Sequence, residues 1–93
     1  MPELSRFYGI VIAMFYQDHN PPHIHVYGGN SKRPDWSIQL EIRDGSILDG
    51  EAPKLALKLV RDWLRLHREE VFDAWYLAVN GEKPFKIAPL RFR

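Results

Sequence analysis

The chain has 93 residues, no cysteine and a formal net charge of +1 at pH 7. A chain of this length forms one domain, residues 1–93, with one modest hydrophobic core. The missing cysteines exclude disulfides, thiolate metal sites and a cysteine nucleophile, so any metal would need histidine and carboxylate ligands. The near-neutral charge gives no general attraction to nucleic acid, so such binding would depend on a local charge cluster.

The sequence also argues against a membrane or secreted location. Residues 1–6 lack the basic region and cleavage site of a signal peptide, and the apolar run 7–16 is too short to cross a bilayer. A small chain without disulfides suits a reducing compartment, so we expect a cytoplasmic protein with no membrane partner. Five phenylalanines, four tyrosines and three tryptophans exceed what one small core needs, and homo-oligomerisation is therefore a further expectation.

The first strand expected covers residues 7–16, which are rich in β-branched and aromatic side chains. Its length predicts a central strand. Residues 18–22 form a turn in which one of the two X-Pro bonds can be cis. A second strand follows at residues 23–27.

The clearest strand signal lies at residues 36–42, where apolar and polar side chains alternate without interruption. Asp44-Gly45 is a hairpin signal that leads into a fourth strand at residues 46–49. The connections are shorter than the crossovers that parallel neighbours need. We therefore expect the four strands to form an antiparallel meander.

Helical periodicity runs from Pro53 to about Val79, before Asn80-Gly81 ends it. A single straight helix would place Glu70 among the apolar side chains, so we infer a kink or short break near residues 66–68 and a second helix. The expected fold class is α+β: a four-stranded antiparallel sheet with two C-terminal helices packed on one face. The residues expected between the layers are Trp36, Ile38, Leu40, Ile42, Trp63 and Trp75.

Residues 18–26 hold three of the four histidines, on either side of a diproline. The two-residue period of a strand would place His23, His25 and Tyr27 on one face and the apolar residues between them on the other. An apolar face could then anchor the strand while the imidazoles are presented. Imidazoles so placed can bind a metal, transfer protons or form structural hydrogen bonds.

In the metal interpretation, His23 and His25 share one divalent ion, zinc or manganese. His19 or Asp18 from the turn would be the third ligand. Such a site would leave a coordination position open for water, as in hydrolytic metal sites. The metal-ligand candidates are therefore His19, His23 and His25, with Asp18 as the alternative third ligand.

Two further interpretations need no metal. In the first, His23 and His25 are catalytic residues, one taking a proton from a ribose 2′-hydroxyl and the other giving a proton to the leaving oxygen. In the second, the histidines are hydrogen-bonded scaffold residues at a surface that binds another protein. The sequence alone does not separate these alternatives.

Basic side chains form a stripe on the expected first helix, at Lys54, Lys58, Arg61, Arg65 and Arg68. This stripe is either a solvated helix face or a docking surface for RNA, DNA or an acidic protein. The binding residues that we predict from the sequence are Asp18, His19, Tyr27, Lys58, Arg61 and Arg65.

Three segments resemble a small bacterial family catalogued as domain of unknown function 4160. They are the run Ser5-Arg6-Phe7-Tyr8-Gly9-Ile10-Val11-Ile12, the block Asp18-His19-Asn20-Pro21-Pro22-His23-Ile24-His25-Val26, and Leu64-Arg65-Leu66-His67-Arg68-Glu69-Glu70 followed by Trp75. The residues that carry over are His19, Pro21, Pro22, His23, His25, His67 and Trp75. The resemblance brings no assigned catalytic residue with it.

The resemblance implies a genetic setting rather than a chemistry. Genes of this family resemble members of two-gene modules, beside a second short domain (domain of unknown function 2442), in an arrangement that looks like a toxin–antitoxin pair. The resemblance therefore implies one component of such a module, with a neighbour-encoded protein partner and with RNA as the possible target. The alternatives are an interaction module or antitoxin with scaffold histidines, and a histidine-ligated metal-binding protein or hydrolase.

Overall fold

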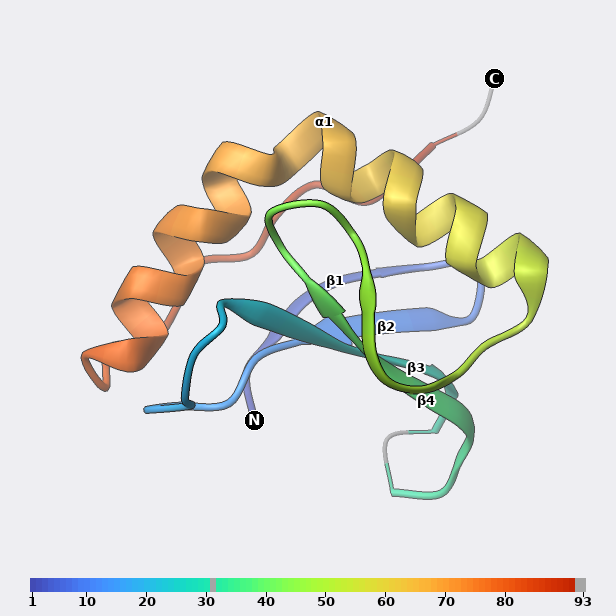
Figure 1. Ribbon diagram of the computed structural model, residues 1–93, viewed down its shortest axis with the longest axis horizontal. Coiled ribbons are helices and arrows are strands. Elements are labelled where there is room, and N and C mark those ends of the chain that lie inside the picture. The colour runs from blue at the N-terminus through green and yellow to red at the C-terminus, as the bar shows by residue number, and fades with distance from the viewer. Residues whose placement is uncertain (31, 92–93) are drawn as a thin grey trace.

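The computed structural model describes residues 1–30 and 32–91. It has an α+β fold, in which one long helix crosses one face of a five-stranded antiparallel sheet of order β1-β2-β3-β4-β5 (Figure 1). The elements are β1 (Glu3–Phe7), β2 (Ile10–Ala13), β3 (His23–Gly29), β4 (Pro34–Glu41), β5 (Ile47–Glu51) and α1 (Lys54–Val79).

The expected single strand at residues 7–16 is wrong, and this accounts for the fifth strand. The chain reverses at Tyr8 and Gly9, which have φ of 50° and 76°, so that Phe7 pairs with Ile10 across a tight hairpin. Two-residue hairpin turns of this kind require positive φ at both central positions. Tyrosine rarely adopts that conformation, so Gly9 was the sole signal in an otherwise strand-like run.

The remaining strands follow the expected meander. All neighbouring strands are antiparallel, and each is paired with the next along the chain. The turn that contains Asp44-Gly45 joins β4 to β5, and it is closed by a hydrogen bond from the Gly45 amide to the Glu41 carbonyl (2.8 Å).

The C-terminal half forms one helix rather than two. The expected kink is nevertheless present, because His67 has non-helical φ and ψ of −121° and 19°, and α1 bends over the sheet (Figure 1). Two side-chain contacts hold the bend. His67 Nδ1 lies 2.8 Å from Glu70 Oε1, and Arg68 Nε donates to the Ile42 carbonyl (3.0 Å).

The hydrophobic core lies between α1 and the helix-facing side of the sheet. Ile24 and Val26 of β3 are fully buried there, and the helix contributes Trp63 and Trp75. Ile38, Leu40 and Ile42 are buried as expected. Trp36 departs from the expectation: it is only partly buried, at the rim of the core, where its indole lies over Gly28.

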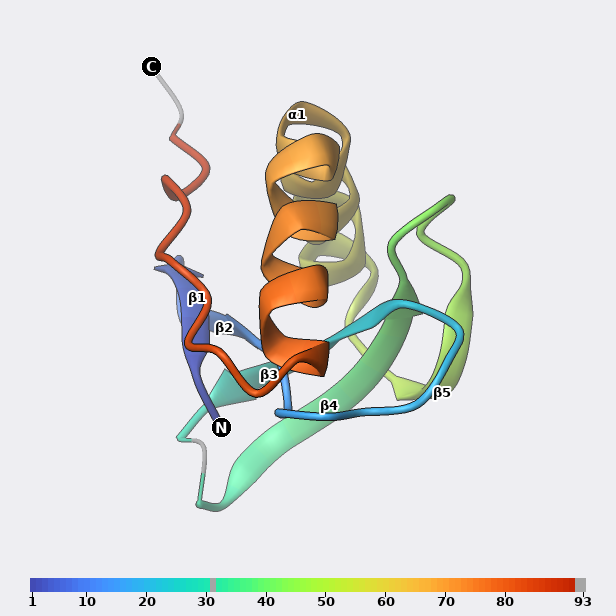
Figure 2. The same cartoon turned by 90° about the vertical axis from the view of Figure 1, so that its left-hand side faces the viewer.

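The chain after α1 returns along β1, as Figure 2 shows. The Ile87 amide donates to the Leu4 carbonyl (2.8 Å), and the buried Trp63 indole donates to the Ala88 carbonyl (2.8 Å). This segment therefore covers the β1 edge of the sheet, whereas β5 forms the opposite edge and all five of its residues are exposed.

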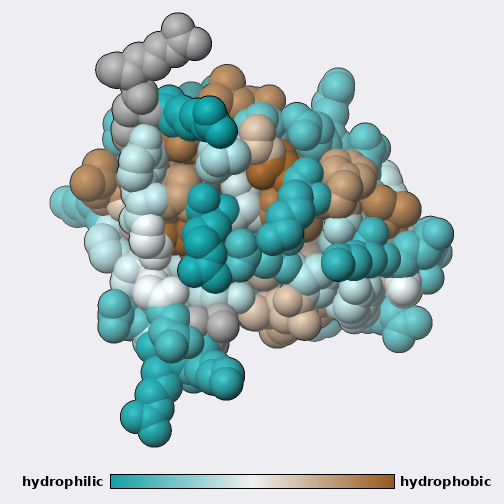
Figure 3. Space-filling model, turned by 180° about the vertical axis from the view of Figure 1, so that it is seen from behind, coloured by the Kyte–Doolittle hydropathy of each residue, from teal (hydrophilic) through white to brown (hydrophobic). Residues whose placement is uncertain are grey.

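The outer surface is mixed in character. Seen from behind, hydrophobic side chains form separate small groups between hydrophilic ones (Figure 3). Within the described residues, no helix combines the length and the apolar character that crossing a membrane would require.

Candidate metal centre

The turn that carries Asp18, between β2 and β3, is fixed to its surroundings at both of its ends. The Gln17 amide donates to the Ala78 carbonyl near the end of α1 (2.9 Å), and the Ile42 amide donates to the Pro22 carbonyl (3.0 Å). The Asn20-Pro21 bond is cis. These contacts hold Asp18 in front of the first residues of β3.

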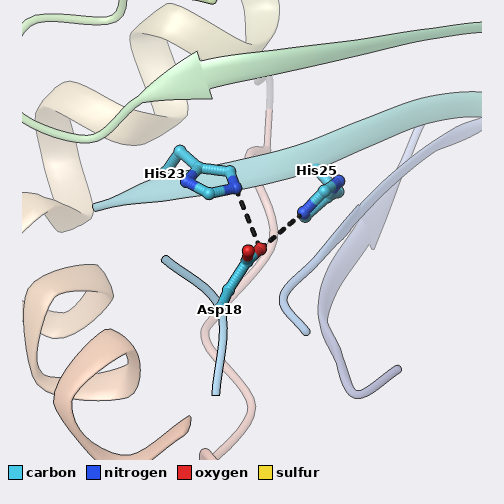
Figure 4. Close-up of side chains that lie close together, drawn as sticks. All are labelled: Asp18, His23 and His25. Carbon is cyan, nitrogen blue, oxygen red and sulfur yellow. Dashed lines mark hydrogen bonds and ion pairs between the residues drawn. The ribbon is translucent and has the colours of Figure 1, made fainter. Parts of the chain in front are cut away.

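Asp18 and two histidines of β3 converge on one point (Figure 4). Asp18 Oδ2 lies 2.9 Å from His23 Nε2 and 3.1 Å from His25 Nε2, and the three candidate ligand atoms all lie within 4.8 Å of one another. The cluster is largely shielded, with side-chain exposures of 10% for Asp18, 4% for His23 and 13% for His25. The predicted common face of His23 and His25 is therefore present.

The orientation of His23 is fixed by its second ring nitrogen. Nδ1 lies 2.7 Å from the Pro21 carbonyl oxygen, which can only accept a hydrogen bond, so Nδ1 carries the hydrogen. Nε2 is then left to face Asp18. The ring also packs against Trp75, with the ring centroids 5.3 Å apart. This explains how Trp75, a distant residue in the sequence, contributes to the site.

The environment of His25 favours its neutral form. Burial lowers the pKa of His25, the nearby His23 lowers it further, and the contact with Asp18 opposes this shift only in part. The imidazole packs against Phe15, with centroids 4.1 Å apart. A neutral imidazole has a lone pair available for a metal ion.

Asp18 is kept ionised by its neighbours. Burial alone would raise the pKa of the carboxyl, but the hydrogen bond with His25, the backbone amide of His19 and the charge of His23 together lower it. His19 contacts the other oxygen of Asp18, with its amide 2.9 Å and its Nδ1 3.0 Å from Oδ1. The His19 side chain is 90% exposed and lies outside the group of converging ligands. Asp18 is thus the third member of the group.

The donor set suits a divalent ion. Zinc binds imidazole nitrogen and carboxylate oxygen at about 2.0–2.2 Å, which places neighbouring ligand atoms of a tetrahedral site roughly 3.3–3.6 Å apart. The two nitrogen–oxygen separations, 2.9 and 3.1 Å, are a few tenths of an ångström shorter than that spacing, so small side-chain shifts would admit the ion. Two imidazoles and one carboxylate would leave at least one coordination position for water or another ligand.

The other predicted binding residues lie outside this cluster. Tyr27 is buried on the sheet face opposite α1, where it packs with Val11 and Ala13. The helix cations have partners of their own. Arg61 donates to the Gly45 carbonyl (3.0 Å), whereas Lys58 and Arg65 both pair with Asp62 (3.0 and 3.2 Å).

A cavity beside His25 was not anticipated. It occupies about 230 Å³ on the sheet face opposite the helix, and its walls include Phe15, Ser37, Gln39 and Asp49. The alternation in residues 36–42 already placed Ser37 and Gln39 on one face. The pairing of that face with His25 depends on strand register, which the alternation alone does not specify.

Comparison with known proteins gives one match. The family model described as "Domain of unknown function (DUF4160)" matches residues 9–76, a range that contains Asp18, His23 and His25. No curated protein and no solved structure matches the chain.

Proposed function

This chain belongs to the DUF4160 family, and from that premise we propose that it is a metal-binding protein that holds a divalent ion through Asp18, His23 and His25. One observation carries the proposal. His23 Nδ1 carries a hydrogen that it donates to the Pro21 carbonyl. If the ring is neutral, Nε2 therefore has no hydrogen, and its lone pair points at Asp18 Oδ2, 2.9 Å away. Two acceptors in contact repel each other, and a positive charge must lie between them.

That charge is either a proton or a metal ion, and the surroundings favour the metal. A second imidazole nitrogen, His25 Nε2, lies 3.1 Å from the same Asp18 oxygen. Protons can satisfy the two contacts only one at a time, with a hydrogen on each imidazole, whereas a single metal ion would bind both histidines and the carboxylate together. The hydrogen bond from His23 Nδ1 to a backbone carbonyl is the outer contact that commonly orients metal-binding histidines.

The same geometry disfavours metal-free acid–base catalysis by His23 and His25. Both Nε2 atoms are directed at Asp18, and the other nitrogen of His23 is occupied by Pro21. Acid–base catalysis by two histidines needs one free nitrogen on each ring, directed at the substrate, and this arrangement does not provide that pair. A bound ion would instead supply the chemistry, by lowering the pKa of a coordinated water to generate a hydrolytic nucleophile.

Metal content and thermal stability test the proposal. Purified protein should bind one equivalent of zinc or manganese, and an ion at 100-fold its Kd should stabilise the fold by about 2.7 kcal/mol. For a domain of this size, that corresponds to a rise in Tm of roughly 10–20 °C. The His23→Gln variant should lose both effects. His19→Ala is the matched control and should retain them, because His19 lies outside the ligand group.

Results that point to a proton instead would overturn the metal function. If the protein binds no divalent ion and its Tm is unchanged by zinc, manganese or nickel, Asp18, His23 and His25 form a scaffold ion pair. The melting temperature of His23→Gln would then fall by the same amount with and without added metal.

A second candidate function is partner binding at the β5 edge. All five residues of β5 are exposed, including Ile47 (45%) and Leu48 (40%), and an open strand edge can pair with an added strand. This supports the prediction of a neighbour-encoded protein partner in a toxin–antitoxin-like module. Homo-oligomerisation and RNA binding stay predictions, the latter weakened by the partners that Arg61, Lys58 and Arg65 already have.

Growth and copurification test this second candidate. A toxin should arrest growth when induced alone, and the double substitution His23→Ala with His25→Ala should relieve the arrest. Harmless expression together with a stable complex with the neighbour-encoded protein supports a binding module. That complex should be lost in the double variant Ile47→Lys with Leu48→Lys but retained in the exposed helix variant Leu66→Lys. If the protein neither arrests growth nor forms a complex with the neighbour-encoded protein, this second function is wrong.

A further inference from the structure

Polar side chains form a grid on the sheet face opposite α1. In the β3, β4 and β5 registers, His25 lies opposite Gln39, and Gln39 lies opposite Asp49. In the next row, Tyr27 lies opposite Ser37. Directly opposed residues of antiparallel strands point to the same side, so these five side chains share one surface.

This grid is the floor of the cavity beside the metal ligands. The cavity has a volume of about 230 Å³, and Phe15 forms part of its wall. Phe15 is 43% exposed and packs against His25, so one aromatic ring contacts both the ligand cluster and the cavity. The volume lies below the range of about 300–1,000 Å³ that holds drug-sized ligands. The cavity therefore suits a small metabolite-sized molecule rather than a folded partner.

The charge of the cavity favours a cation. Among the residues that the structure describes, the cavity lining holds one carboxylate, that of Asp49, and no lysine or arginine side chain, and Met1 is also part of the wall. Two arginines outside the cavity lining have carboxylate partners of their own: Arg6 pairs with Glu3 at 2.8 Å, and Arg43 pairs with Glu41 at 3.0 Å. A phosphate group would meet repulsion at Asp49, whereas an amine or guanidinium group would be attracted there.

We propose that this cavity binds a small organic cation, with its amine or guanidinium group at Asp49 and a carboxyl or acyl oxygen directed toward the metal ligands. His25 and Asp49 are two strand spacings apart, about 10 Å between backbones, which leaves room for one short molecule between their side chains. Ser37, Gln39 and the Tyr27 hydroxyl provide hydrogen-bonding groups along the way. The predicted contact between the ligand and the metal ligands depends on the proposed metal function. The predicted contact between the ligand and Asp49 does not depend on it.

L-Arginine and L-citrulline are matched probes for the cationic end, because citrulline replaces the guanidinium group with a neutral urea of the same shape. Calorimetry with zinc-loaded protein should give an affinity for arginine at least about tenfold higher than for citrulline, since a hydrogen bond to a charged group is the stronger kind. Arginine should also shift the ring NMR signals of Phe15 and Tyr27. Asp49→Asn should remove the preference for arginine while the zinc content stays at one equivalent. Asp44→Asn, an exposed carboxylate outside the cavity, is the control.

The two proposals fail in different ways. If zinc binds but arginine does not bind, or citrulline binds equally well, the cation site is wrong and the metal site stands. If zinc does not bind, the metal function is wrong. Comparing arginine and citrulline binding in zinc-free protein then tests the cation site at Asp49. A preference for arginine that Asp49→Asn removes would then still support the cation site, and equal binding of the two probes would overturn it.

Discussion

His23 and Asp18 face each other across 2.9 Å, and the far side of the imidazole is held by the Pro21 carbonyl at 2.7 Å. The ring therefore cannot rotate to offer Asp18 a different nitrogen without losing a short hydrogen bond. This arrangement commits Nε2 to whatever positive charge lies between the two residues. The same turn supplies both contacts of the ring, because Asp18 provides the carboxylate and Pro21 of the diproline provides the carbonyl.

Asp18→Asn should weaken zinc affinity by at least about 100-fold, since the ion would lose its one anionic ligand and keep two neutral ones. The amide can still exchange hydrogen bonds with the imidazoles, so the variant should fold. Competition against a chromophoric chelator measures the effect, and Asp44→Asn is the control for a lost surface carboxylate. Equal affinity in Asp18→Asn and the native protein would remove Asp18 from the metal site.

In the metal-free protein, the part of the stability that depends on His25 should decrease as the pH falls below about 6.5. Burial lowers the pKa of His25 below the usual 6.5, so the fold prefers the neutral ring while the unfolded chain takes up a proton first. The stabilising contribution is thus complete above pH 6.5 and decreases as the pH falls through the folded-state pKa. The lowered pKa of Asp18 acts in the same direction but only below its usual 3.8.

Urea unfolding in the presence of a chelator, at pH 7.5, 6.5 and 5.5, measures this dependence. His25→Gln should flatten the curve across that interval. A stability difference between the native protein and His25→Gln that is the same at pH 7.5 and 5.5 would contradict the assigned environment of His25.

Gly50→Ala should destabilise the protein by about 2–4 kcal/mol, through backbone strain and overpacking together. Gly50 has a φ of 83°, and a Cβ there would overlap the Ser37 carbonyl oxygen of the paired strand. Gly9→Ala is the matched comparison: φ is 76°, but the new Cβ meets nothing within 4 Å, so only strain of about 1–2 kcal/mol is expected. Chemical denaturation of both variants measures the difference, and equal losses would be inconsistent with close packing of β5 on β4.

Trp63→Phe should cost about 2–4 kcal/mol, because it leaves a cavity in the core and an unpaired carbonyl at Ala88. The chain after α1 should also loosen. Hydrogen exchange at the Ile87 amide, which donates to Leu4, reports this directly. Tighter protection of Ile87 in the variant than in the native protein would show that the indole hydrogen bond does not anchor this segment.

Local patterns in the sequence were sufficient for the alternating strands and for the helix. Ile24 and Val26 are buried and His23 and His25 share the other face, because side chains of a strand alternate whatever surrounds it. The kink at His67 was also predictable, since no straight helix could bury both apolar stripes. The hairpin at Tyr8-Gly9 was not, because a tyrosine with positive φ is held by pairing across the turn and leaves no trace in residue type.

The sequence by itself determined where the candidate site lies and which chemical groups it offers: imidazoles and a carboxylate beside a diproline, with no cysteine. It named His19 as a candidate third ligand, with Asp18 as the alternative. Only the tertiary structure decided between them, because the contacts of Gln17 with Ala78 and of Pro22 with Ile42 orient the turn. The cavity beside His25 likewise exists only after β3, β4 and β5 have paired in one register, since long-range pairing rather than local periodicity sets which side chains become neighbours.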